Sequence, residues 1–106
     1  MPKYLWQASY SSEGLRGVVR EGGTGRRAAA KNLVEALGGT LEAFYFAFGD
    51  ADAIIIADLP DEEAATAVAL AVNADDRIDL KTTVLLTPEE VDAAARRSVE
   101  YRPPGA

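Results

Sequence analysis

Two residue types are missing from this sequence, and each absence excludes a class of chemistry. The 106 residues include no cysteine, so the chain has no disulfide framework and no thiolate nucleophile. They include no histidine either, which excludes histidine-ligated haem, most zinc and copper sites, and nucleophiles activated by histidine. We therefore expect no bound cofactor and no transition metal, and acid–base chemistry would fall to Asp, Glu, Lys or Tyr.

Long apolar runs are also missing, and positive charge is scarce. No run approaches the length of a membrane span, and the first predicted strand begins almost at Met1, so we expect a cytoplasmic protein without a signal peptide. The 17 acidic residues outnumber the 11 basic ones and give a net charge of −6, a sign that repels phosphate backbones and anionic lipid. Nucleic acid and membrane surfaces are therefore not expected as partners.

What is present is the composition of one globular domain spanning residues 1–106. Hydrophobic residues make up 48% of the chain and charged residues 26%, and these ordinary values argue against disorder. A chain of this length buries roughly two-thirds of the surface that it exposes when unfolded. We expect a single hydrophobic core.

Apolar spacing, glycines and capping residues predict the element order β-α-β-β-α-β, followed by a C-terminal helix. The predicted strands span residues 3–10, 40–48, 53–57 and 77–86. The first predicted helix is capped by Ser11 or Ser12, runs through Leu15, Val18 and Val19 and is stopped by Gly22-Gly23. The other predicted helices span residues 26–37, 62–72 and 88 to about 100. This order predicts an α+β, ferredoxin-like fold with a four-stranded antiparallel sheet and both main helices on one face.

The second and third predicted strands are apolar on both sides. Phe44, Phe46 and Phe48 alternate with a second apolar row, and Ile54 and Ile56 oppose Ile55. The second row of the 40–48 strand consists of Leu41, Ala43, Tyr45 and Ala47. In a sheet with one face exposed to solvent, the strands would alternate apolar and polar residues instead. We therefore expect a second copy to cover the helix-free face, giving a homodimer or a multiple of one; the alternative is that the extra apolar residues pack under loops.

Several segments spread along most of the chain resemble one protein family. They are Tyr4 to Tyr10 (YLWQASY), Glu21-Gly22-Gly23, Arg26-Arg27, Gly38-Gly39, Leu41 to Gly49 (LEAFYFAFG), Lys81 to Glu90 (KTTVLLTPEE) and Tyr101 to Ala106 (YRPPGA). On these segments the chain resembles the GYD family, small bacterial proteins related to the dimeric α/β-barrel superfamily. The family's Gly-Tyr-Asp signature corresponds here to Gly49, Ala51 and Asp52, so alanine stands where the family has tyrosine.

The resemblance implies a ferredoxin-like protomer and a dimeric α/β barrel in which two sheets lie face to face. It implies no established activity. Relatives in the wider superfamily include cofactor-free monooxygenases, lactone isomerases and haem enzymes, so fold alone does not transfer a function.

Polar residues alternate with apolar ones on the first and fourth strands, which are neighbours in this fold. Gln7 and Ser9 form the polar row of the first strand, and Lys81 and Thr83 belong to the row of the fourth strand that should face away from the helices. We expect these four residues to border a ligand pocket on the helix-free face, with Trp6 and Tyr45 as aromatic walls. A desolvated Lys81 could act as a base; the alternative is an ion pair of Lys81 across the dimer interface.

Two further clusters are weaker candidates. Thr24, Arg26 and Arg27 follow a glycine pair at a helix start and could hold a phosphate or carboxylate, although the segment matches no phosphate-binding motif. A helix break with two solvated arginines is the favoured interpretation. Asp50 and Asp52 could bind a cation, but aspartate is an ordinary turn residue and the turn interpretation is favoured. No metal site is predicted.

The leading functional hypothesis is a homo-oligomeric barrel that binds a small, partly apolar organic molecule. A cofactor-independent monooxygenase or isomerase acting in the same cavity is the second hypothesis, and it requires a titratable group with a perturbed pKa. A structural interaction module without a ligand is the third, and it predicts a filled barrel.

Overall fold

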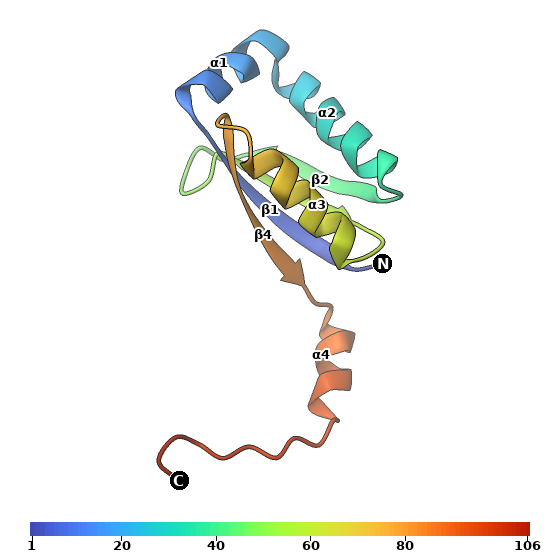
Figure 1. Cartoon of the computed structure of the whole chain (residues 1–106). Coiled ribbons are helices and arrows are strands. Elements are labelled where there is room, and N and C mark those ends of the chain that lie inside the picture. Colours follow the sequence, from blue (N-terminus) through green and yellow to red (C-terminus); the bar gives the residue numbers. More distant parts are fainter.

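The computed structural model describes all 106 residues and contains four strands and four helices (Figure 1). The strands are β1 (Lys3–Tyr10), β2 (Thr40–Phe46), β3 (Ala53–Asp58) and β4 (Ile78–Leu85). The helices are α1 (Ser12–Glu21), α2 (Gly23–Ala36), α3 (Glu62–Asn73) and α4 (Pro88–Ala95). The strands form one antiparallel sheet in the order β2-β3-β1-β4, which confirms the predicted ferredoxin-like arrangement.

Short polar side chains start three of the helices where the sequence predicts. Ser11 Oγ accepts a hydrogen bond from the Gly14 N–H at 3.2 Å, and Asp61 Oδ1 accepts one from the Ala64 N–H at 2.9 Å. Thr87 caps α4 in a reciprocal capping box with Glu90. Only Gly22, with φ of 81°, separates α1 from α2, so α2 begins three residues earlier than the predicted start at residue 26.

The hydrophobic core lies between the sheet and the helices α2 and α3. Alternate residues of β1 and β3 are buried in it, and both helices contribute side chains from above. The core residues are Tyr4, Trp6, Ala8, Val34, Ala53, Ile55, Ala57, Leu59, Ala65, Val68 and Leu80. Since both helices pack on the same face, the opposite face of the sheet remains helix-free.

Strand β2 begins at Thr40 as predicted but departs from the prediction at its C-terminal end and in its register. It ends at Phe46, and Phe48 lies beyond it with a positive φ of 53° and a largely exposed ring. The register with β3 shifts between Leu41 and Ala43, so one extra residue stands in β2. Leu41 therefore pairs with Ala57 and packs against the core, and its predicted place beside Ala43 and Tyr45 is wrong.

The C-terminal segment stands away from the rest of the protein. Helix α4 ends at Ala95, not near residue 100, and every residue from Leu86 to Ala106 is exposed. Figure 1 shows α4 projecting beyond the end of β4, away from both faces of the sheet. A short helix without packing is barely stable on its own, which accounts for its early end. None of the helices combines the length and apolar character needed to cross a membrane.

Candidate functional site

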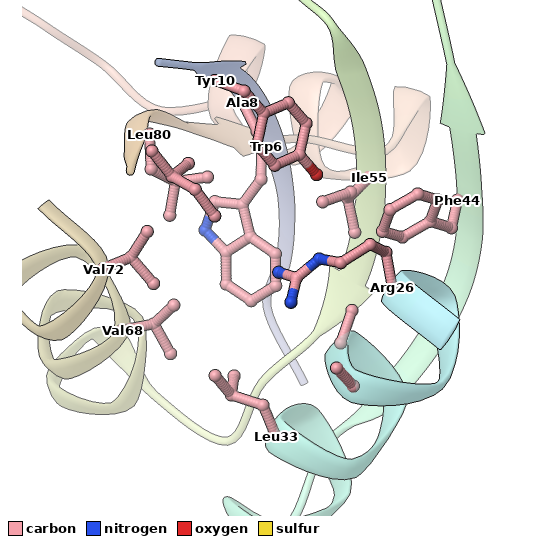
Figure 2. A pocket seen from close by; sticks show the side chains of 13 residues that line it. Trp6, Ala8, Tyr10, Arg26, Leu33, Phe44, Ile55, Val68, Val72 and Leu80 are labelled. Atoms are coloured by element: carbon pink, nitrogen blue, oxygen red, sulfur yellow. The ribbon is translucent and has the colours of Figure 1, made fainter. Parts of the chain in front are cut away.

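A partly open cavity of about 200 Å³, termed the internal cavity because it lies beneath the helices, is formed between the sheet and the helices α2 and α3 (Figure 2). Thirteen residues line it, of which twelve are hydrophobic, and all four strands contribute. The single charged residue among them is Arg26 of α2. Trp6 of β1 stands in the middle of the lining residues in Figure 2, with Val68, Val72 and Leu33 around it.

Short side chains on α2 leave this space open. Ala29 and Ala30 line it from α2, where longer apolar residues would fill the gap, and Ala8 on β1 is equally short. The cavity is open on one side, since Ala29 and Leu33 in its lining are exposed. A small molecule can therefore reach it from solvent.

Two buried nitrogen atoms at the cavity have no hydrogen-bond partner. They are Nε1 of Trp6, a residue only 2% exposed, and Nε of Arg26. The Arg26 guanidinium makes one long contact, from Nη1 to Glu21 Oε2 at 3.5 Å. Leaving a buried donor unpaired costs about 1–3 kcal/mol. Both donors therefore lack an acceptor in the protein, and other side chains cover them from solvent.

Arg26 stands at the boundary between the cavity and the surface. Together with Tyr10 and Ile78 it also lines an outer hollow beside α1. That hollow is polar, and its further lining includes Glu13, Arg20, Glu21 and Arg77. The cavity thus has an apolar interior and a charged side at the junction of α1 and α2.

The residues predicted to border a pocket on the helix-free face do share that face. Gln7 pairs with Lys81 on one side and with Ile54 on the other, and Ile54 pairs with Tyr45. These four residues form one row across the whole sheet. Ser9 pairs with Asp79 and Thr83 with Leu5 in the adjacent rows.

In the single chain this face is open. Tyr45 is 70% exposed, and Lys81 and Thr83 are also exposed. The main hollows of the protein are not lined by Gln7, Lys81 or Thr83. Ligand binding along this row therefore stays a prediction. Such a site also requires a second copy of the chain, or another partner, to cover this face of the sheet.

Trp6 does not belong to that row, and its predicted place beside Gln7 is wrong. Successive residues of a strand point to opposite faces of the sheet. Trp6 is buried under the helices together with Tyr4 and Ala8, whereas Gln7 lies on the helix-free face. Trp6 therefore lines the internal cavity instead.

The family model of the GYD domain matches residues 4–95 of the 106 residues. The chain belongs to the GYD domain family. The match spans every strand and helix from β1 to α4, so the internal cavity and the helix-free face both lie within the GYD domain. Searches of curated proteins and of solved structures found no match.

The second candidate cluster of this GYD domain is divided between two places. Thr24 and Arg27 line a hollow beside β2 that also includes Tyr45, whereas Arg26 lines the internal cavity. Adjacent residues of a helix point about 100° apart, which separates Arg26 from Arg27. The predicted anion site of three residues is therefore not assembled, and of the three only Arg26 lines the internal cavity.

A signal for this position does exist in the sequence. Arg26, Ala30 and Leu33 are spaced at i, i+4 and i+7, so they lie on one stripe of α2. That stripe faces the core, since all three residues line the cavity. An arginine on the apolar stripe of a core-facing helix is the observation that sequence analysis missed.

Of the two aspartates in the hairpin turn, Asp52 has structural contacts. Asp52 Oδ2 accepts a hydrogen bond from the Tyr10 N–H at 2.8 Å, and the Asp52 N–H donates to the Ala8 carbonyl at 2.8 Å. These bonds tie the β2–β3 turn of the GYD domain to the end of β1, which supports the turn interpretation. No group of three or more acidic side chains is placed to hold a metal ion.

Proposed function

We propose that this GYD-domain protein is a homo-oligomeric barrel protein that binds a small, partly apolar organic molecule in the cavity between the sheet and the helices α2 and α3. The observation that supports it is a partly open cavity of about 200 Å³ whose lining is apolar except for Arg26. Small-molecule sites have this composition, mostly apolar with a few placed polar groups. An apolar cavity of about 150 Å³ accommodates benzene, so the ligand is of the size of a monocyclic aromatic compound.

The proposal includes a second copy on the helix-free face. Leu5, Ile54 and Ile56 lie there half-buried, and α4 of the same chain leaves them uncovered (Figure 1). Lys81 and Asp79 alternate on β4 of the same face, so a two-fold partner can place opposite charges against each other. A second copy supplies an apolar surface of the required shape without any further partner.

The row of Gln7, Ser9, Lys81 and Thr83 would then lie inside the barrel. It is a second place where a ligand could bind, and the two places are distinguished by substitution. Lys81→Met should abolish ligand binding and keep the dimer if the ligand lies between the sheets. It should weaken the dimer if Lys81 only pairs with an acid of the partner.

Trp6 makes the internal cavity directly observable, because it is the single tryptophan of the chain. Titration with benzyl alcohol, a small neutral probe, should change the fluorescence of Trp6 in a saturable way and raise the melting temperature. Ala30→Leu fills the cavity and should remove both effects. The matched control is Ala94→Leu on the exposed helix α4, which should leave both effects intact.

Two results would count against the proposal. One is an emission of Trp6 that no probe of this size alters. The other is a response that persists unchanged in the Ala30→Leu variant, because the probe would then bind elsewhere.

A further inference from the structure

We infer that the ligand of the internal cavity is a carboxylic acid with a small apolar body, and that Arg26 holds its carboxylate at the mouth of the cavity. The inference rests on the proposed function, since it names the chemical class of the molecule that the cavity binds. It is carried by the position of one charged side chain in an otherwise apolar lining and by the Nε–H of its guanidinium, which has no partner in the protein.

The charge of Arg26 is the first argument. A guanidinium stays protonated throughout the physiological pH range. Its side chain is 27% exposed, so most of it is withdrawn from water, and its single acidic contact is the long one to Glu21. A cation in this position favours an anion over a neutral molecule of the same shape.

The geometry of the guanidinium is the second argument. Glu21 contacts Nη1, whereas the buried Nε–H has no partner. A carboxylate that approaches an arginine side-on takes Nε–H and Nη2–H in two parallel hydrogen bonds. Glu21 therefore does not compete for the donors that a carboxylate of the ligand would use, and the carboxylate would reach the buried Nε–H after a small shift of the side chains that cover it.

The place of Arg26 is the third argument. The guanidinium points from α2 toward the middle of the cavity in Figure 2, and the same side chain also lines the outer hollow beside α1. A carboxylate at this boundary keeps part of its hydration, while its apolar body extends toward Trp6 and Leu33. This orientation avoids the large cost of burying an unpaired charge among apolar side chains.

The unpaired Nε1 of Trp6 does not decide between an anion and a neutral molecule, because either can offer an oxygen atom. The assignment of a carboxylate therefore depends on Arg26 alone. This makes the inference testable with one pair of ligands and one pair of variants.

The test compares the affinities for benzoate and benzamide at pH 7, measured by Trp6 fluorescence and by calorimetry. Benzamide has nearly the same shape as benzoate and no charge. The wild-type protein should bind benzoate at least about tenfold more tightly than benzamide. Arg26→Gln should remove most of this preference by weakening benzoate and leaving benzamide nearly unchanged. The matched control is Arg27→Gln, which removes the same charge from the neighbouring hollow and should keep the preference.

The failure of the inference and the failure of the proposed function give different results. Equal affinity for benzoate and benzamide in the wild-type protein overturns the carboxylate and leaves the cavity as a binding site. Absence of binding for benzoate, benzamide and benzyl alcohol alike overturns both. If Arg26→Gln does not fold, Arg26→Lys is the second variant, since it keeps the positive charge but cannot donate two parallel hydrogen bonds to one carboxylate. An unchanged preference of Arg26→Lys for benzoate would contradict the bidentate contact.

Discussion

At the scale of single residues, Tyr4 is buried without a partner for its hydroxyl. It is 2% exposed, and its oxygen has no hydrogen bond. Because an unpaired buried hydroxyl costs about 1–3 kcal/mol, Tyr4→Phe should leave the free energy of unfolding unchanged or raise it by about 1 kcal/mol. Urea unfolding measures this. A loss of more than about 1 kcal/mol would show that the hydroxyl has a stabilising partner in solution.

The same substitution should alter the alkaline stability. Burial, helped by Glu62 and Asp61, raises the pKa of Tyr4, and hydrogen bonds to Asp58 and Glu42 raise the pKa of Lys3. The unfolded chain therefore loses these protons first, above its ordinary pKa values of 10.0 and 10.5, and stability falls as the pH rises through this range. Tyr4→Phe should flatten the fall without abolishing it, because Lys3 still contributes. Melting temperatures measured between pH 9 and 11.5 test this prediction. A wild-type melting temperature that does not fall over this range would contradict it.

Two glycines of α1 provide a matched pair for a packing prediction. A Cβ at Gly14 would clash with the backbone carbonyl of Arg77, whereas a Cβ at Gly17 would have its nearest neighbour at 3.9 Å. Gly14→Ala should therefore lower the melting temperature by several degrees, since a mobile side chain cannot relieve a backbone clash. Gly17→Ala should raise stability by up to about 1 kcal/mol through helix propensity. Equal effects of the two substitutions would contradict the close approach of α1 to Arg77.

At the scale of secondary-structure elements, Asn73 joins α3 to the edge strand β4. Its side chain donates to the Leu80 carbonyl at 3.0 Å and accepts from the Leu80 N–H at 2.7 Å. β4 lies at the edge of the sheet, so these groups of Leu80 have no neighbouring strand to pair with. One amide side chain thus satisfies both groups and occupies part of the open edge.

Removing the side-chain amide of Asn73 should destabilise the protein. Asn73→Ala should lower the free energy of unfolding by about 2 kcal/mol, since two hydrogen bonds to part-buried backbone groups are lost together. Asn32→Ala, at an exposed position of α2, is the control and should have little effect. Chemical denaturation compares the three proteins. A difference of less than about 0.5 kcal/mol between the variants would mean that water replaces the amide fully.

At the scale of the whole molecule, the open face of the sheet determines the expected assembly. Ile54 lies at the centre of the row from Tyr45 to Lys81, and its neighbour in the next row is Ile56. Ile54→Lys should turn a dimer into a folded monomer, because a buried, unpaired charge opposes association. Val19→Lys on α1, where the wild-type side chain is 84% exposed, is the control and should leave the assembly unchanged. Light scattering that shows a stable wild-type monomer at micromolar concentration would contradict the predicted assembly.

The sequence by itself determined the order of the elements and most of their faces. Ser11, Asp61 and Thr87 mark helix starts through local hydrogen bonds, which depend only on residues three positions away. Alternation along β1 and β4 places Gln7 and Lys81 on one face. The same alternation, applied to Trp6, would have placed it on the opposite face from Gln7.

Only the tertiary structure decided where the internal cavity lies. The extra residue in β2 reverses the side of Leu41, and nothing in the local pattern marks this bulge. The cavity depends on the distance between α2 and the sheet and on the short Ala29 and Ala30 meeting Trp6 across it. Periodicity along the chain assigns a side chain to a face, whereas the volume left between faces depends on residues far apart in sequence. For this reason the sequence pointed to a ligand site on the helix-free face, and the cavity with Arg26 became visible only in three dimensions.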